Sequence, residues 1–263
     1  MFGRFRAFAS LAMAVGLAMV LGGTACAIEG GAEVPPGTYP WLVRVGNPAE
    51  GYCSGSLVSP RHVVSAAHCF AKKPDKPEGM FAYFRTETRA YTVKVVRAER
   101  HPWGAGDART ADVAVVTLEH PVRTTPIKLI APGDFYPTWP GMKLTVAGYG
   151  STGHQRPEHA HELPFTATYR CAKPGPQWFC ADAPRPGTGV RPEDSGGPAF
   201  RKARGGGGRH VLVGTVSNHR DHHTWFTNLA QPPLNEWIRF KIFGGWSASR
   251  DRGAASVAGE PQP

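Results

Sequence analysis

The chain has 263 residues and a formal net charge of +10; 41% of it is hydrophobic and 19% is charged, so a packed core is possible. It contains 32 glycines and 25 prolines, which indicate many turns. This composition excludes a wholly disordered chain, a collagen, a long coiled coil and a multi-span membrane protein.

The first 27 residues have the layout of a secretory signal peptide. A basic start with two arginines precedes an apolar run at residues 7–21, and residues 25–27 (ACA) form an A-x-A cleavage site. One alternative is an uncleaved membrane anchor, for which the apolar run is short. Another is lipidation of Cys26, although the preceding residues 23–25 resemble a bacterial lipoprotein box only weakly. We expect cleavage after residue 27, secretion, and no stable membrane insertion afterwards.

The cysteine count agrees with export. Of the five cysteines, cleavage would remove one and leave four, at positions 53, 69, 171 and 180. An even count in an exported chain predicts two disulfides, with buried free thiols as the alternative.

The mature chain remains basic, because the expected signal peptide contains two arginines and no acids. Such a charge permits loose attraction to polyanions or membrane surfaces. The basic residues are scattered, however, with no basic stripe on a helix and no aromatic platform. We therefore expect no nucleic acid partner.

Twelve short apolar or alternating runs follow, each flanked by turn-forming residues, which is typical of an all-β sandwich or barrel. A proline-rich connector at residues 121–140 separates them into two sets of six, which suggests two similar halves. The runs are Trp41–Val45, Cys53–Val58, His62–Ala66, Phe81–Phe84, Tyr91–Val96, Val113–Leu118, Leu144–Tyr149, Phe165–Tyr169, Trp178–Ala181, Pro198–Arg201, Val211–Val216 and Trp225–Leu229.

A single helix is predicted near the end of the chain, at residues 232–243. Two prolines suit its first turn, and Leu234, Trp237, Ile238 and Ile242 follow at helical spacing. The remaining residues, 244–263, are small and polar, so we expect a disordered tail.

Three segments carry chemistry: residues 65–69 (SAAHC), Asp112 at the start of an apolar run, and residues 194–198 (DSGGP). Each alone has an ordinary explanation, because a histidine beside a cysteine is usually structural and the other two are common in turns. Their order and context make them more informative together than singly.

With its flanking motifs, the chain resembles the trypsin/chymotrypsin family of serine proteases over nearly all of the mature part. The resemblance implies two six-stranded antiparallel β-barrels, at about residues 28–125 and 140–230, followed by the helix. The motifs that carry it are residues 28–31 (IEGG) with 39–41 (YPW), 53–57 (CSGSL) with 66–69 (AAHC), 101–103 (HPW) with 112–114 (DVA), 194–198 (DSGGP) and 225–227 (WFT).

The resemblance implies a catalytic triad in the cleft between the barrels. Ser195 would be the nucleophile, which is weak at neutral pH unless a base takes its proton. His68 would be that base, because histidine is the side chain that ordinarily exchanges a proton near neutral pH. Asp112 would orient the imidazole, and Ser217 matches a serine that braces this aspartate.

Two disulfides are implied in the same way, Cys53–Cys69 and Cys171–Cys180. Arg191 stands where many family members have a further cysteine, and the usual partner of that cysteine is absent too.

The family's mature N-terminus inserts into the serine domain and pairs with the acid before the serine. Here these residues would be Ile28 and Asp194. Because Ile28 directly follows the expected cleavage site, signal peptidase alone would release it, with no separate activating propeptide.

The chain departs from the family at Glu193, where glycine is almost always found. The backbone N–H groups of residues 193 and 195 would form the oxyanion hole, and glycine permits backbone geometries that a Cβ disfavours. Glu193 could twist its peptide away, or the peptide could point inward with the side chain in solvent. We expect the second arrangement.

Specificity is assigned by position to three residues. Gly189 would lie at the base of the primary pocket, where cleavage after Lys or Arg would need an acid. His219 and Thr224 would form pocket walls larger than usual and favour small side chains. Alternatively, His219, His223 and Arg191 could attract an acidic side chain.

Histidines gather at residues 154–161 and 219–223, but without metal-ligand spacing, so we expect solvated loop histidines and no metal or other cofactor. The overall expectation is a secreted, monomeric serine endopeptidase acting on protein or peptide substrates. One rival is an inactive binding protein on the same fold. The other, an α/β-hydrolase esterase, fails because Glu193 breaks its G-x-S-x-G motif and the order of the triad is wrong.

Overall fold

The computed structural model describes residues 27–71, 77–102, 111–151, 158–170, 175–203 and 208–244. The expected signal peptide, apart from its last residue, and the expected tail beyond Gly244 lie outside these ranges. Among the described residues, no helix combines the length and apolarity needed to cross a membrane.

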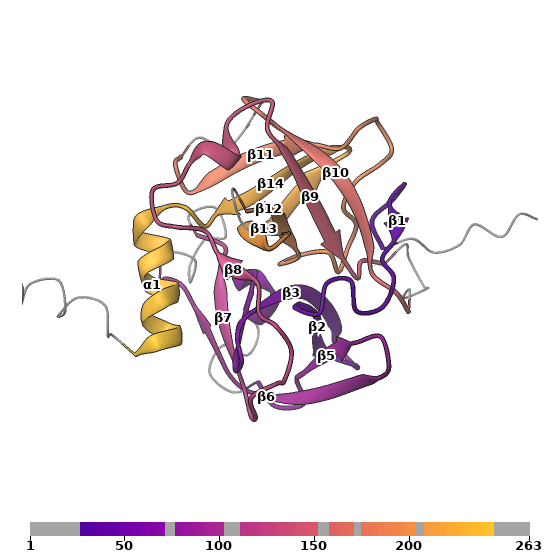
Figure 1. Ribbon diagram of the computed structural model, residues 1–263, viewed down its shortest axis with the longest axis vertical. Coiled ribbons are helices and arrows are strands. Elements are labelled where there is room, and N and C mark those ends of the chain that lie inside the picture. Colours follow the sequence, from indigo (N-terminus) through magenta and orange to yellow (C-terminus); the bar gives the residue numbers. More distant parts are fainter. Residues whose placement is uncertain are drawn as a thin grey trace, which may run out of the picture.

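Two closed antiparallel β-barrels make up the molecule (Figure 1). The first has the strand order β2-β3-β4-β7-β6-β5, and it closes because β2 pairs with both β3 and β5. Its strands are β2 (Leu42–Asn47), β3 (Gly51–Ser59), β4 (His62–Ser65), β5 (Phe81–Arg85), β6 (Ala90–Arg100) and β7 (Ala114–Leu118).

The second barrel has the order β9-β10-β11-β14-β13-β12 and closes through pairing of β12 with β9. Two-residue strands extend it: β1 (Ala32–Glu33) pairs with β10, and β8 (Lys128–Leu129) pairs in parallel with β13. The six barrel strands are β9 (Lys143–Gly148), β10 (His161–Thr168), β11 (Trp178–Asp182), β12 (Pro198–Lys202), β13 (His210–Arg220) and β14 (His223–Asn228).

All twelve predicted runs overlap the twelve barrel strands, and the predicted fold class is confirmed. The alternation behind the prediction is clearest in β10, where Leu163, Phe165 and Ala167 are buried between more exposed neighbours. The sequence pattern did not reveal β1 and β8, because two residues are too few to show a period.

The C-terminal helix α1 (Pro232–Phe243) lies at one side of the molecule and contacts both halves (Figure 1). Prolines occupy its first turn, and Gly244 ends it with φ 66°, donating its N–H to the carbonyl of Phe240. The buried Asn235 amide donates to the carbonyls of Ile130 (2.8 Å) and Leu229 (2.7 Å). Lys241 forms an ion pair with Glu99 of β6, so the helix also contacts the first barrel.

Candidate active site

His68 is held by Asp112 through two hydrogen bonds. It lies on a 3₁₀ turn, η1 (Ala67–Phe70), that follows β4. Its backbone N–H donates to Asp112 Oδ1 at 2.9 Å, and its ring Nδ1 lies 2.7 Å from Asp112 Oδ2. Because an aspartate in its ordinary ionised form only accepts, Nδ1 carries the proton and Nε2 of the neutral ring is left as an acceptor.

Asp112 lies two residues before β7 and is completely buried, and its carboxylate accepts several hydrogen bonds. Besides the two His68 groups, the Ser217 hydroxyl donates to Oδ2 at 2.6 Å. The Thr227 hydroxyl donates to the Asp112 carbonyl at 2.9 Å. Both hydroxyls come from the second barrel, so this barrel fixes an acid that belongs to the first.

Ser195 lies on the tight turn that leads into β12, and its carbonyl accepts the N–H of Ser54 at 2.9 Å. The turn passes close to the first barrel at Gly196, which has φ 76°. A Cβ at that position would lie 2.5 Å from the Ser54 carbonyl oxygen and 2.6 Å from the Ala66 nitrogen. Only glycine fits there, and the close approach brings Ser195 to the junction of the two barrels.

Ser195, His68 and Asp112 line one cavity of about 330 Å³. The remaining described residues around it are Arg191, Pro192, Val216, Ser217, Asn218 and His219. The three predicted triad residues are therefore brought together in an open hollow large enough for a side chain of a bound peptide.

The Pro192–Glu193 peptide has a defined orientation. The Pro192 carbonyl accepts the N–H of Ser151 at 2.7 Å, and in a trans peptide the next N–H points the opposite way. The N–H of Glu193 therefore points away from Ser151. In the same way the Asp194 carbonyl accepts the N–H of Gly197 at 2.8 Å. The N–H of Ser195 therefore points away from Gly197. Glu193 has φ 73°, a left-handed conformation that is unusual for a residue with a Cβ.

Asp194 is fully buried, and burial raises the pKa of its carboxyl well above the ordinary value. The N–H groups of Gly150 (2.7 Å) and Arg191 (2.8 Å) donate to it. Ala27 and Ile28 are also completely buried. A Cβ placed on Gly150 would contact both the Ala27 carbonyl oxygen and the Asp194 carboxylate, so the Ala27–Ile28 peptide lies beside this acid.

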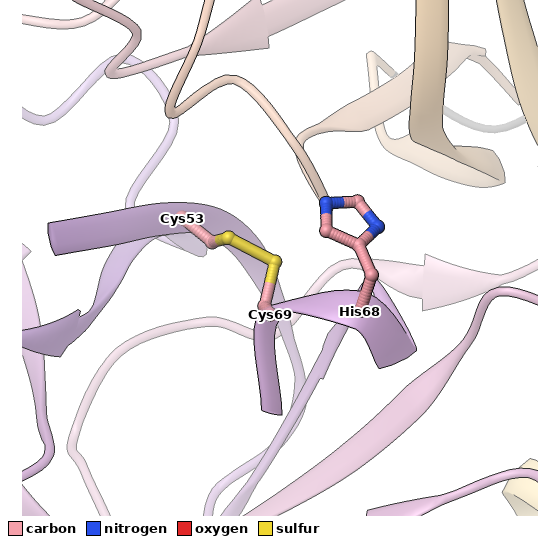
Figure 2. Close-up of side chains that lie close together, drawn as sticks. All are labelled: Cys53, His68 and Cys69. Atoms are coloured by element: carbon pink, nitrogen blue, oxygen red, sulfur yellow. A yellow bond between two sulfur atoms is a disulfide. The ribbon is translucent and has the colours of Figure 1, made fainter. Parts of the chain in front are cut away.

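The predicted Cys53–Cys69 disulfide is present, and it ties β3 to the turn that carries His68 (Figure 2). These two sulfurs and the His68 ring form the sole cluster of three possible metal ligands in the described ranges. Both sulfurs are used in the disulfide, so the cluster is not a metal site. Cys180 is also in a disulfide, but Cys171 lies outside the described residues, so the Cys171–Cys180 pairing stays a prediction.

Of the three residues predicted to form the substrate pocket, one lines the cavity beside Ser195 and two do not. His219 lines the cavity beside Ser195. Gly189 and Thr224 are not among its lining residues. Gly189 exchanges two backbone hydrogen bonds with Glu29, and Thr224 is completely buried in β14.

The histidine groups are divided among separate partners. His159 lies 3.5 Å from Glu33, and the His161 Nδ1 accepts the N–H of Ala27; His154 lies outside the described residues. In the second group, His222 pairs with Asp221 (2.7 Å) and His223 with Asp182 (2.6 Å).

A family model described as Trypsin matches residues 28–237, which is most of the chain. The chain belongs to the trypsin family. Its relatives include a trypsin of Saccharopolyspora erythraea, 31% identical over 183 residues that make up 65% of this chain and 80% of that protein.

Other relatives of this trypsin-family chain carry a different name. Glucanase inhibitor protein 1 of Phytophthora sojae is 30% identical over 201 residues, 72% of this chain and 77% of that protein. Glucanase inhibitor protein 1 of Phytophthora infestans is 34% identical over 139 residues, 52% of this chain and about half (54%) of that protein.

Two residues that support the site had no role assigned from the sequence. Ser54 and Thr227 both lie in motifs that carry the family resemblance. Nothing in the local sequence shows that Ser54 contacts the loop before Ser195, or that Thr227 supports Asp112.

Proposed function

We propose that this trypsin-family chain is a secreted serine endopeptidase that hydrolyses peptide bonds through an acyl-enzyme on Ser195. One observation carries the proposal: the buried Asp112 binds Nδ1 of His68 at 2.7 Å, on the wall of a cavity that Ser195 also lines. An oriented imidazole next to a serine hydroxyl is the arrangement that makes a weak nucleophile reactive.

In this proposal His68 Nε2 takes the proton of Ser195 as the hydroxyl oxygen attacks the scissile carbonyl. Asp112 keeps the ring in the required tautomer and stabilises the imidazolium. The imidazolium then gives its proton to the leaving amine, which breaks the peptide bond. Water activated by the same ring hydrolyses the ester and restores Ser195.

The N–H groups of Glu193 and Ser195 are proposed as the oxyanion hole. The carbonyls of the two preceding residues are engaged by Ser151 and Gly197, so each N–H faces away from those contacts. Donors held in this way stabilise the negative oxygen that develops during attack. In this arrangement Glu193 takes the backbone conformation that the turn requires, despite its Cβ.

Activation is proposed to follow from removal of residues 1–27 by signal peptidase. The new ammonium of Ile28 would arise beside the buried Asp194 carboxylate, which has two N–H donors but no cation in direct contact among the described residues. A cation at this point would compensate the burial of the charge.

Labelling with a fluorophosphonate probe tests the proposal. The secreted protein, starting at Ile28, is expected to react covalently, and Ser195→Ala is expected to abolish the label while leaving the melting temperature near that of the parent. Folded, correctly processed protein that does not label would refute proteolytic function.

A second candidate is a binding protein on the same fold with little or no catalysis. Two observations favour it: the relatives named glucanase inhibitor protein, and the left-handed Glu193 next to the proposed oxyanion hole. By that analogy its partner would be a glucanase. It predicts no fluorophosphonate label, together with inhibition of an endoglucanase that Ser195→Ala retains.

A further inference from the structure

Among the described residues, three basic side chains and a single acid line the cavity beside Ser195. His68 is already bonded to that acid, so Arg191 and His219 are the basic side chains left for a ligand. Arg191 and His219 line it, whereas its acid, Asp112, is completely buried and accepts three hydrogen bonds. Because Asp112 is buried and engaged, the charge that a ligand side chain would meet in this cavity is that of Arg191.

Arg191 is held rigidly but retains unused donors. Its two terminal nitrogens donate to the carbonyls of Gly187 (2.9 Å) and Val190 (3.2 Å), and its Nε lies 3.7 Å from the partly exposed Glu29 carboxylate. Each terminal nitrogen of a guanidinium has two hydrogens, so one N–H on each remains. The side chain as a whole is 23% exposed, so it is partly shielded from water.

His219 adds a second donor. Its backbone N–H is bonded to the Asn218 side chain, and within the described ranges its ring has no hydrogen bond or ion pair. Burial, followed by the nearby Arg191 charge, lowers its pKa below the ordinary value. Near neutral pH the ring is therefore uncharged and offers one N–H, while Arg191 supplies the charge.

Asp182 and Asp221 do not line the cavity, and each is engaged by other groups. Asp221 accepts hydrogen bonds from the N–H of Gly187 and from the ring of His222, which lower its pKa to about 2. It is therefore ionised, but its charge is engaged by these two groups. Asp182 pairs with His223. Gly189, the position at which a tryptic pocket would need an acid, has no side chain.

We propose that this cavity selects an acidic side chain, so that the preferred cleavage is after Glu or Asp, with Arg191 and His219 as specificity-determining residues. The cleavage itself rests on the proteolytic function proposed above. The recognition does not, because a carboxylate can bind the cavity whether or not Ser195 reacts.

Kinetic measurements on matched peptides test the selection. Four fluorogenic peptides differ only before the scissile bond, with Glu, Gln, Leu or Lys, and Gln is the uncharged isostere of Glu. We expect kcat/KM for the Glu peptide to exceed that for the Gln peptide by at least about tenfold, because polar groups built to bind a carboxylate reject its uncharged analogue.

Variants assign the preference to residues. Arg191→Gln should reduce the Glu/Gln ratio to near one, and Arg191→Lys should keep part of it. His219→Gln should lower the ratio less and serves as the second variant if Arg191→Gln does not fold. Arg220→Gln is the matched control, since it removes a neighbouring positive charge that does not line the cavity; its ratio should match the parent.

Binding to the Ser195→Ala variant separates this inference from the proteolytic function. Calorimetry with the same peptides should show tighter binding of Glu than of Gln. Turnover without preference for Glu overturns this inference alone. An equal fall of the Glu/Gln ratio in Arg220→Gln and Arg191→Gln does the same. Preferential binding of Glu without turnover by the parent overturns the protease proposal alone. If the parent shows no turnover and Ser195→Ala shows no preferential binding, both proposals are overturned.

Discussion

The hydroxyl of Ser54, on β3 of the first barrel, donates to the carbonyl of Glu193 in the second at 3.0 Å. The same hydroxyl accepts the N–H of Tyr149 at 2.9 Å, and the Ser54 backbone N–H donates to the Ser195 carbonyl. One buried serine thus holds the loop around the proposed nucleophile from two sides.

Ser54→Ala should weaken both the fold and the site. Loss of this hydroxyl removes one hydrogen bond from the part-buried Glu193 carbonyl and one from the buried N–H of Tyr149, which costs about 1–3 kcal/mol of unfolding free energy. The loop around Glu193 is then less well placed, so fluorophosphonate labelling should slow by up to about 100-fold. Urea unfolding and labelling rates measure the two effects.

Ser56→Ala is the control for that experiment. Ser56 is equally buried on the same strand, but its hydroxyl has no hydrogen-bond partner among the described residues. Its removal should leave stability and labelling nearly unchanged. Equal losses in the two variants would contradict the role given to Ser54.

Glu193→Gly and Glu193→Ala together isolate the cost of the left-handed backbone. Both remove the carboxylate, but only glycine adopts φ 73° without a Cβ penalty of about 1–2 kcal/mol. The greater freedom of glycine in the unfolded chain offsets about 0.4–1 kcal/mol of this. Glu193→Gly should therefore be about 0.5–1 kcal/mol more stable than Glu193→Ala in urea unfolding.

The same variants test whether Glu193 impairs catalysis. Because the Pro192–Glu193 peptide is already oriented by Ser151, Glu193→Gly should label at a rate within a few-fold of the parent. An increase of 100-fold or more would show that Glu193 misplaces an oxyanion donor.

The pH dependence of stability should distinguish the chain that retains Ala27 from the form that begins at Ile28. Burial raises the pKa of Asp194 in the folded unprocessed chain, so the folded state binds its proton more tightly than the unfolded state does. This tighter proton binding stabilises the folded state. The stabilisation is present below the unfolded pKa of about 3.9 and is lost as pH rises through the raised folded pKa. In the processed form the ammonium pairs with the ionised carboxylate and removes this loss.

The advantage of the processed form, measured as a difference in unfolding free energy, should therefore grow as pH rises above about 4. It should persist until the ammonium deprotonates, above its free value of about 8. Asp194→Asn should remove this growth above about pH 4, because the side chain no longer ionises. A constant difference in the parent would contradict pairing of Ile28 with Asp194.

The Cys53–Cys69 disulfide should stabilise the fold substantially. It joins residues 16 apart, and closing a loop of this size contributes about 3 kcal/mol in the chain-entropy model. Replacement of both cysteines by alanine should lower the unfolding free energy by about this amount. It should also slow labelling, because η1 carries His68. A single replacement would leave a free thiol, so the double variant is the cleaner comparison.

The sequence alone was sufficient for the fold class and for the residues that could carry chemistry. Strand alternation and turn residues are local, so the twelve strands were readable without knowledge of their partners. The histidine, aspartate and serine were also readable, because their three segments occur in an order and among flanking motifs that resemble one family.

Only the tertiary structure decided how distant groups meet. Ser54 and Glu193 are 139 positions apart, and Ser217 and Asp112 are 105 apart. It also separated His219, which lines the cavity beside Ser195, from Gly189 and Thr224, which do not. The reason is physical: a strand's pattern records which face is buried, but not which side chain of the other barrel packs against it.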